Sequence, residues 1–507
     1  MPPSPALPEP AVCEQARLSR DPRFDGLFFT AVRTTGIYCR PVCPAPPPRP
    51  RNVDYYPNAA AAEAAGFRPC LRCRPELSPA DGRWHRGDDT VARALALIDT
   101  GVLASQPLSA LAARLHIGER QLRRMFVDRL GAAPIGVHGT RRLLFAKQLL
   151  TETALPITEV ALAAGFNSVR RFNAVFQDAY RMPPRDLRKA PRVATGDVLT
   201  LRLGYRPPYD LPAMLDFLRG RALPGIEVVD EAAYTRVIGD AEAPGWLRVD
   251  RWPSTPNDPA PAALRLQVHA CPPARLQDTV QRVRRMFDLD AAPDTIAAHL
   301  GHDARLAPLL RARPGLRLPS GWDGFEIAVR AVIGQQVSVA AARTLTARLS
   351  RRFGAQLPEP FVTQGFAHLF PTPDTLVKAD FDGLGLIGSR IATIRGIAAA
   401  LLDGRVDFDR ARTLDDFVAR WTALPGIGPW TAHYIALRAL GHPDAFPAED
   451  LVLQKALPTD GTRMTANVLR AHAEAWRPWR GYAVIHLWRD AAASTAARSV
   501  SSPRTAA

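Results

Sequence analysis

Two close pairs of cysteines lie in the first eighty residues: Cys39 with Cys43, and then Cys70 with Cys73, separated by 26 residues. Each short loop can deliver two sulfurs to one side of an ion, and two such pairs suit a tetrahedral zinc site. Cysteine ligands of zinc are thiolates, which are nucleophiles at neutral pH without a separate base. The spacing therefore predicts a zinc centre, either purely structural or reactive.

A second group of reactive side chains lies near the other end of the chain. Glu449 and Asp450 are adjacent carboxylates, about 20 residues after the turn Leu-Pro-Gly-Ile-Gly-Pro-Trp-Thr at 424–431. In such a turn Gly426 and Gly428 can form a hairpin whose backbone N–H groups bind a phosphate. An isolated acidic pair more often caps a helix, so capping and acid–base chemistry both stay open here.

The length and composition of the chain limit which kinds of domain can position these groups. The chain has 507 residues, 47% hydrophobic and 22% charged, which is typical of a soluble globular protein of roughly three to four domains. We find no apolar stretch near the roughly 18 residues of a membrane span, and no secretory signal at the start. We therefore expect a cytoplasmic protein without a membrane partner. Cys13 and Cys271 stand apart from the clustered cysteines and are expected to be inert.

Positive charge is concentrated in the first part of the chain. Residues 1–195 hold 28 basic and 17 acidic side chains, and so carry +11 of the total net charge of +16. This excess favours a polyanionic partner, although a GC-rich genome that favours arginine would produce it as well. Near the cysteines the arginines that could approach phosphate are Arg33, Arg40, Arg68, Arg72 and Arg74.

A weak internal repeat follows the cysteine module. Residues 108–126 and 157–176 each read as a short helix, a turn and a second helix that carries arginines. We expect Gly118 and Gly165 to let the chain turn. The second helices then expose residues able to read base edges and phosphates: Arg120, Gln121, Arg123, Arg124, Asn167, Ser168, Arg170 and Arg171. The alternative is an ordinary helical bundle with a basic, solvated face.

The remaining chain begins with a small α+β pattern and continues as helices. After an expected linker at 191–196, strands are predicted at 199–203, 227–229, 235–238, 246–251 and 264–269. Helices are predicted at 212–221 and 274–287, and helices dominate from about residue 325. Taken alone, this pattern identifies no function.

The first two segments resemble known families. Residues 32–43 (Val-Arg-Thr-Thr-Gly-Ile-Tyr-Cys-Arg-Pro-Val-Cys) and 65–73 (Ala-Gly-Phe-Arg-Pro-Cys-Leu-Arg-Cys) closely resemble the zinc module of the Ada adaptive-response protein. The resemblance implies that Cys39 irreversibly accepts a methyl group from a DNA methylphosphotriester, with all four cysteines binding one zinc ion. The phrase Gly-Phe-Asn-Ser at 165–168 and the aromatic residues that follow resemble the AraC-type DNA-binding domain.

The C-terminal half resembles the AlkA-type 3-methyladenine glycosylases of the helix-hairpin-helix superfamily. The resemblance rests on the hairpin turn together with residues 325–339, 430–437 and 476–488. It implies Asp450 as the catalytic carboxylate, with an aromatic pocket formed by Trp430, Tyr434 and Trp488. An electron-poor methylated base would be held there by cation–π attraction of roughly 0.5–2 kcal/mol per ring.

One position departs from the family pattern, and another distinguishes this chain from bifunctional relatives. The residue expected to fill the gap left by an extruded base is apolar in the well-known member but is Gln336 here. Trp430 stands where bifunctional relatives carry a lysine, so we predict base removal without strand cleavage, and no cofactor for this half.

We therefore predict a multidomain, mainly α fold: a zinc-bound α+β module (1–82), a double helix-turn-helix domain (85–190), a TBP-like α+β subdomain (197–312), an all-α glycosylase domain (313–492) and a disordered tail (493–507). The predicted function is an alkylation-damage response by a monomeric, nucleoid-associated bacterial protein that binds double-stranded DNA and RNA polymerase. The rival prediction is a non-enzymatic transcription regulator with a structural zinc and a C-terminal half that only binds damaged DNA.

Overall fold

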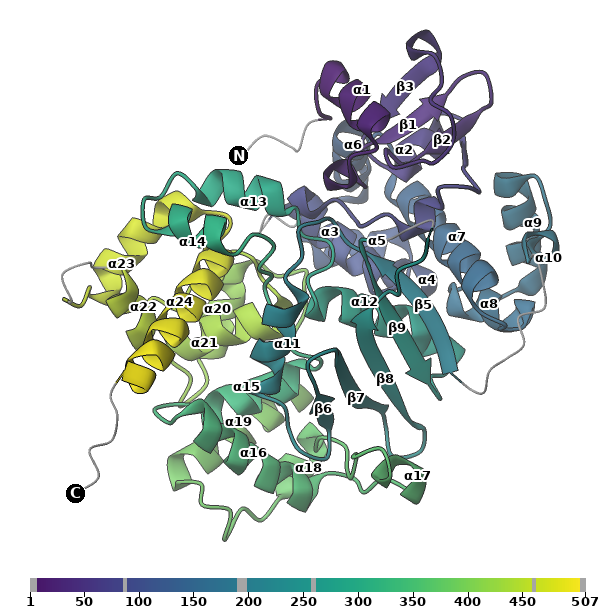
Figure 1. Ribbon diagram of the computed structural model, residues 1–507. Helices are drawn as coiled ribbons and strands as arrows, with labels where there is room; N and C mark the ends of the chain where they lie inside the picture. The colour runs from purple at the N-terminus through teal and green to yellow at the C-terminus, as the bar shows by residue number, and fades with distance from the viewer. Residues whose placement is uncertain (1–6, 85–88, 189–197, 257–260, 458–461, 502–507) are drawn as a thin grey trace.

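The computed structural model describes residues 7–84, 89–188, 198–256, 261–457 and 462–501. The N-terminal unit, purple in Figure 1, is a small sheet with strand order β3-β1-β2-β4 and adjoining helices. Its elements are α1 (Pro10–Ser19), β1 (Phe29–Val32), β2 (Ile37–Cys39), β3 (Val53–Tyr56), α2 (Ala59–Ala64) and β4 (Arg68–Pro69). Strands β2 and β4 are parallel neighbours, so the segments that follow them emerge side by side.

The next unit contains the two helix-turn-helix pairs. Its helices are α3 (Thr90–Asp99), α4 (Val102–Ser105), α5 (Leu108–Arg114), α6 (Glu119–Leu130), α7 (Pro134–Glu152), α8 (Ile157–Ala163), α9 (Val169–Tyr180) and α10 (Pro184–Leu187). The long helix α7 joins the pair α5–α6 to the pair α8–α9.

The two turns differ in how the chain reverses direction. Gly165 has a left-handed φ of 76°, as expected. The prediction for Gly118 is wrong: its φ is −74° and it forms the N-cap of α6. The left-handed residue in this turn is His116, with φ of 56°. In each pair the left-handed residue lies two positions after the end of the first helix, and that position falls on His116 rather than on the glycine.

The α+β unit is a five-stranded antiparallel sheet of order β5-β9-β8-β7-β6. Its elements are β5 (Val198–Gly204), α11 (Leu211–Arg219), β6 (Glu227–Val229), β7 (Ala233–Gly239), β8 (Pro244–Arg251), β9 (Ala263–His269) and α12 (Pro273–Met286). All five strands and both helices occur where the sequence predicts them, within a few residues at each end. The expected linker at 191–196 lies outside the described residues.

The rest of the chain is helical. Its helices are α13 (Pro293–Leu300), α14 (Leu306–Ala312), α15 (Gly324–Ile333), α16 (Val339–Phe353), α17 (Glu359–Val362), α18 (Pro373–Lys378), α19 (Gly388–Leu402), α20 (Leu414–Thr422), α21 (Pro429–Ile435), a π-helical continuation (Ala436–Leu440), α22 (Leu451–Ala456), α23 (Ala466–His472) and α24 (Arg480–Ser501). Residues 493–501 of the expected tail continue helix α24, and 502–507 lie outside the described residues. The mainly α, multidomain fold class is confirmed. None of the described helices has both the length and the apolar content needed to cross a membrane.

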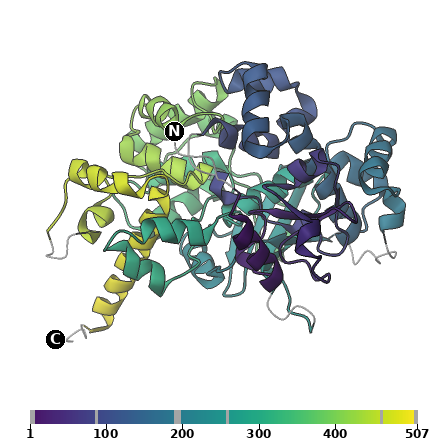
Figure 2. The ribbon, with the colours of Figure 1, turned by 90° about the horizontal axis from the view of Figure 1, so that it is seen from above.

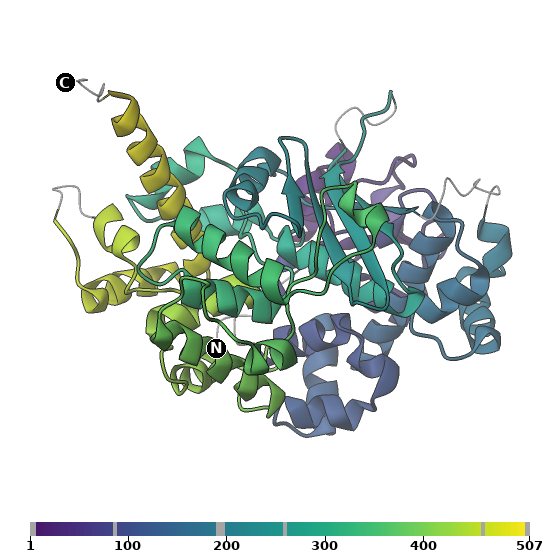
Figure 3. The same ribbon diagram turned by 90° about the horizontal axis from the view of Figure 1, so that it is seen from below.

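The units pack against one another. Leu143 of α7, Phe172 of α9, Leu201 of β5 and Leu266 of β9 belong to one hydrophobic core, so the second helix-turn-helix pair and the sheet bury apolar surface jointly. The first pair instead packs against the segment between α19 and α20, where Ala411 joins its hydrophobic core, and Figures 2 and 3 show these parts side by side. There Arg114 forms an ion pair of 2.8 Å with Asp409.

Candidate metal centre and active site

The four cysteines converge at the ends of the parallel strands β2 and β4. Cys39 ends β2 and Cys70 directly follows β4, so pairing of these strands places the two sulfurs close together. A turn after each strand brings in Cys43 and Cys73. Their sulfur atoms all lie within 4.8 Å of one another, which fits the coordination of a single tetrahedral ion. Four cysteine sulfurs in this arrangement can hold one metal ion.

The four ligands differ in exposure. Cys70 and Cys73 are buried at 6% exposure each, whereas Cys39 and Cys43 are partly exposed. Sulfur atoms of the buried pair accept backbone N–H bonds, from Arg40 to Cys73 at 3.3 Å and from Arg72 to Cys70 at 3.4 Å. The first cysteine pair is therefore the more accessible pair of residues.

Only part of the arginine cluster faces solvent. Arg33 pairs with Asp54, and Arg40 and Arg74 are also engaged in ion pairs. Arg68 and Arg72 are exposed and form no ion pair with any residue in the part of the chain that the structure describes. The expectation that all five arginines can approach phosphate is therefore corrected for Arg40 and Arg74, whereas Arg33, Arg68 and Arg72 are exposed.

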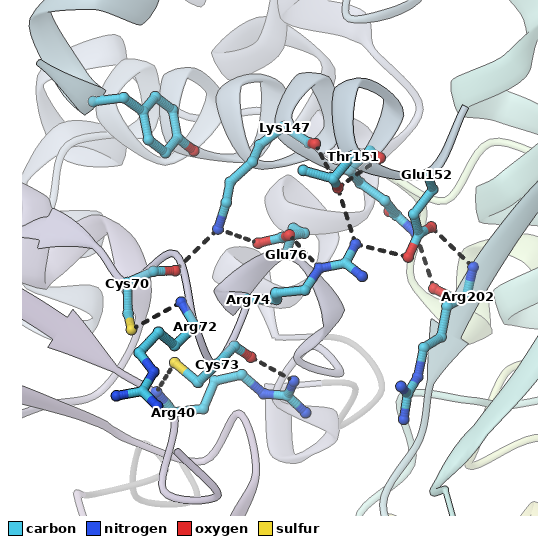
Figure 4. A network of polar contacts seen from close by, with 12 residues as sticks. Arg40, Cys70, Arg72, Cys73, Arg74, Glu76, Lys147, Thr151, Glu152 and Arg202 are labelled. Carbon is cyan, nitrogen blue, oxygen red and sulfur yellow. Dashed lines mark hydrogen bonds and ion pairs between the residues drawn. The ribbon is translucent and has the colours of Figure 1, made fainter. Parts of the chain in front are cut away.

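A buried ionic chain connects the second cysteine pair to helix α7 (Figure 4). The Lys147 ammonium donates to the backbone carbonyl of Cys70 at 3.0 Å and pairs with Glu76 at 2.7 Å. Arg74 bridges Glu76 at 3.0 Å and Glu152 at 2.7 Å. Glu152 lies at the end of α7, so the zinc loop, the short turn Pro75–Leu77 and α7 form one connected network.

The same network reaches the α+β unit. Glu152 accepts the backbone N–H of Arg202 in strand β5 at 3.0 Å. A second connection starts at the carbonyl of Cys73, which accepts from Arg40 at 3.0 Å, while Arg40 pairs with Asp25. The Asp25 carbonyl in turn accepts from the buried Arg206 at 2.7 Å.

The second site is a cavity of about 490 Å³ between α15, α16, α21 and α24. Asp450 lines it and also caps α22, since its Oδ1 accepts the backbone N–H groups of Val452 and Leu453 at 3.0 Å each. Of the two alternatives left open by the sequence, helix capping is thus confirmed for Asp450. Its neighbour Glu449 forms an ion pair with Arg470 at 2.6 Å.

Two indole rings also hold the Asp450 carboxylate. Trp430 Nε1 donates to Oδ2 at 3.0 Å, and Trp488 Nε1 donates to Oδ1 at 3.2 Å. Tyr434 stacks on Trp430 with ring centres 5.2 Å apart and lies 6.1 Å from Trp488. The structure thus brings these four predicted residues together. A carboxylate fixed by four donors beside aromatic walls can stabilise a developing cation or accept a proton from water.

The cavity also contains residues that sequence reasoning missed. Arg221, Arg330 and Arg438 line it, of which Arg438 is 3% exposed. Arg438 is four residues after Tyr434, which is four after Trp430, so helical spacing could have identified it. Arg221 comes from the α+β unit, about 200 residues earlier in the chain, and no local pattern indicates it.

The hairpin and the expected wedge lie near one edge of the cavity. Gln336 is exposed in the turn between α15 and α16, with a left-handed φ of 55°. Its neighbour Gln335 bonds the Gly426 carbonyl at 3.1 Å and the Thr431 hydroxyl at 3.0 Å, and so ties this turn to the hairpin. Gly426 and Gly428 are both exposed.

The arginines predicted on the second helices of the two pairs are all solvent-exposed: Arg120 and Arg124 on α6, and Arg170 and Arg171 on α9. Ser168 caps α9 by accepting the Arg171 N–H at 3.3 Å. Both helices therefore present basic faces away from their cores.

Four family models match successive parts of the chain. They are the metal binding domain of Ada at residues 12–76, a helix-turn-helix domain at 111–190, the AlkA N-terminal domain at 200–323, and the HhH-GPD superfamily of base excision DNA repair proteins at 329–480. The first contains all four clustered cysteines, and the last contains Asp450 and the hairpin.

Three relatives match nearly the whole chain or about half of it. The chain is 39% identical to a probable bifunctional transcriptional activator/DNA repair enzyme AlkA of Mycobacterium tuberculosis, over 94% of this chain and 95% of that protein. It is 34% identical to DNA-3-methyladenine glycosylase 2 of Escherichia coli, over 56% of this chain and 95% of that protein. It is 31% identical to the bifunctional transcriptional activator/DNA repair enzyme Ada of Escherichia coli, over 50% of this chain and 66% of that protein.

Proposed function

This chain belongs to the family of bifunctional transcriptional activator/DNA repair enzymes that combine Ada-type and AlkA-type parts, and we propose from that premise that its C-terminal half is a monofunctional glycosylase for alkylated purines of the 3-methyladenine type. The observation that carries the proposal is the Asp450 carboxylate, held by two indole N–H groups inside an aromatic-walled cavity.

The proposed reaction follows from this arrangement. A base in the duplex must first be extruded, and the cavity of about 490 Å³ has room for it. The ring faces of Trp430, Tyr434 and Trp488 attract an electron-poor base. As the glycosidic bond breaks, Asp450 stabilises the positive charge on the sugar and takes a proton from the attacking water. Gln336 would fill the gap in the duplex, and the backbone of Gly426 and Gly428 would contact a phosphate.

An assay of base release tests the proposal. The full chain is incubated with duplex DNA that contains one 3-methyladenine or hypoxanthine, and free base and abasic sites are measured. We expect free base, with strand breaks only after alkali treatment and no adduct after borohydride, because Trp430 stands in place of a catalytic lysine. Binding without base release would support the non-enzymatic regulator instead, and a borohydride-trapped adduct would refute monofunctionality.

A second function is favoured by the exposure of the first cysteine pair. Cys39 is partly exposed at the end of β2, while the exposed Arg68 and Arg72 can approach phosphate. Bound zinc supplies the positive charge that keeps the four sulfurs as thiolates. We propose that the Cys39 sulfur attacks the methyl group of a phosphotriester: a carbon–sulfur bond forms, the carbon–oxygen bond breaks, and a phosphodiester anion leaves.

This transfer changes the charge of the module. Four thiolates on one divalent ion carry a formal −2, and methylation of Cys39 leaves −1, which reduces repulsion from DNA phosphates. We therefore propose that methylation strengthens binding of Arg120, Arg124, Arg170 and Arg171 to an operator, where the protein, as a monomer, recruits RNA polymerase. Mass spectrometry of the Cys39 peptide after exposure to methylated DNA should show one added methyl group. An unmethylated peptide, or unchanged operator affinity after methylation, would contradict the respective step.

A further inference from the structure

Two cations that line the glycosylase cavity, the half-buried Arg221 and the buried Arg438, have no role in the proposed reaction. Of the three arginines that line the cavity, Arg330 is neutralised by Glu227 at 2.9 Å and Glu326 at 3.0 Å. Within the described ranges, Arg221 and Arg438 form no ion pair. The cavity therefore keeps positive charge that its own carboxylates do not neutralise.

Aromatic rings and carbonyls hold these two guanidinium groups in place. Their central carbons lie 3.8 Å (Arg221) and 4.6 Å (Arg438) from the ring centre of Phe217. Arg438 also donates to the carbonyl of Pro319 at 2.8 Å and to the Tyr434 hydroxyl at 3.3 Å. We name Arg221, Arg438 and the Tyr434 hydroxyl the cationic floor of the cavity.

The floor stays charged at neutral pH. Burial lowers the pKa of Arg438 to about 10, which still leaves the guanidinium protonated. Burial alone would raise the pKa of the Tyr434 hydroxyl, but the nearby charges of Arg438, Arg221 and Arg330 outweigh it and lower that pKa. The floor is therefore rich in donors and attracts negative charge.

This charge matters because glycosidic cleavage sends an electron pair to the base. A base that is already cationic, such as 7-methylguanine, leaves as a neutral molecule, and a cationic floor repels it beforehand. An uncharged base, such as hypoxanthine, gains negative charge as it leaves, and donors aimed at that charge lower the barrier. The aromatic walls and the cationic floor thus favour different classes of base.

We propose that Arg221, Tyr434 and Arg438 are specificity-determining residues that support the release of uncharged purines with acceptor atoms on their edges. The bond between the sugar C1′ and the base N9 breaks, and its electron pair goes to the base, where the floor stabilises it. The water oxygen bonds to C1′, and the proton that Asp450 takes from this water ends on the released base. The inference rests on the proposed function, because it takes this cavity as the reaction site.

Single-turnover rates on two duplexes test the inference, one containing hypoxanthine and the other 7-methylguanine. In Arg221→Met the hydrophobic stem is kept and the charge is lost. We expect the ratio of the hypoxanthine rate to the 7-methylguanine rate to fall about tenfold or more, because one preorganised donor to developing negative charge is commonly worth that much. Arg221→Lys keeps the charge and should restore most of the ratio, and Arg438→Met should lower it further.

The outcomes distinguish failure of this inference from failure of the glycosylase proposal on which it rests. If the folded variants, checked by thermal unfolding, lose activity equally on both duplexes, the floor does not set specificity and the inference is overturned, while the glycosylase proposal stands. If the wild-type chain releases neither of these bases nor 3-methyladenine, the cavity is not the reaction site and both proposals fall. A ratio unchanged in Arg221→Met and Arg438→Met alike also overturns the inference.

Discussion

The Asp450 carboxylate is fixed from two sides, by backbone N–H groups at the start of α22 and by the indoles of Trp430 and Trp488. These four N–H donors hold the carboxylate in one orientation and leave the side chain little rotational freedom. In the proposed reaction, Asp450 therefore depends on the aromatic side chains as donors as well as on their ring faces.

Replacing Trp488 with phenylalanine separates these two contributions. Trp488→Phe keeps an aromatic wall but removes the N–H donated to Asp450 at 3.2 Å. A hydrogen bond to a charged group contributes about 1.5–3 kcal/mol, so we expect single-turnover base release to slow by about tenfold or more. The matched control is Trp246→Phe, a tryptophan stacked on His269 in the sheet, which should leave the rate unchanged. Equal rates for Trp488→Phe and wild type would show that the N–H is dispensable.

The reactive residues differ in how far the sequence alone could identify them. The four cysteines are indicated by spacing, and Asp450 by its distance from the glycine turn together with the family resemblance. The sequence predicted that Arg40 and Arg74 could approach phosphate, because it does not reveal that Asp25 and Glu152 form ion pairs with them.

At the scale of elements, the hairpin between α20 and α21 is a tight turn held against α19. Gly426 has φ of 84°, and an added Cβ would come within 2.0 Å of the Thr393 hydroxyl oxygen. Gly428 is extended, and its added Cβ would meet no atom within 4 Å. A side chain at position 426 is therefore excluded by conformation and by Thr393, whereas the described structure leaves room for one at position 428.

Alanine at each glycine should give different results. Gly426→Ala should lower the free energy of unfolding by about 1–3 kcal/mol, because the residue must adopt a left-handed conformation and displace Thr393. Gly428→Ala should leave unfolding unchanged but weaken DNA binding if the backbone there approaches a phosphate. Chemical denaturation and duplex-binding titrations measure the two effects. Equal stability of the two variants would contradict the steric argument.

Secondary structure was most predictable where one face of an element is buried. The strands of the α+β unit alternate strongly enough for all five to be located. The turn in the first helix-turn-helix pair was less predictable, because His116 takes the left-handed position and glycine preference pointed to Gly118 instead.

At the scale of the whole molecule, Arg206 joins the zinc module to the glycosylase half. Its side chain is 1% exposed and donates to backbone carbonyls on both sides of the contact, at Asp25 (2.7 Å) and at Asp290 (2.7 Å) and Ala291 (3.0 Å). The zinc module is thus packed into the protein and is not carried on a free tether.

Removing this guanidinium should loosen the zinc module. Arg206→Leu leaves several buried carbonyls without a donor, and we expect a loss of about 3 kcal/mol or more of unfolding free energy, with faster proteolytic release of the N-terminal unit. The control is Arg181→Leu, which removes an exposed ion pair with Asp178 and should cost little. Identical proteolysis of Arg206→Leu and wild type would show that the module is held by other contacts.

The arrangement of units could not be predicted from the sequence. Each unit has its own periodicity and motifs, but the residues that join them, such as Lys147 and Arg206, are single polar positions in otherwise ordinary segments. Nothing in their local pattern distinguishes a buried interdomain cation from a solvated one.

The central claim is that Asp450 in its aromatic cavity performs base release, and Asp450→Asn tests it most directly. The amide keeps the helix cap and the shape of the side chain but removes the negative charge. Single-turnover release from a duplex with one alkylated purine should fall by about a hundredfold or more, while duplex affinity and thermal stability stay close to wild type. Glu449→Gln, which alters the neighbouring carboxylate paired with Arg470, should keep its activity. Base release by Asp450→Asn at the wild-type rate would contradict the account.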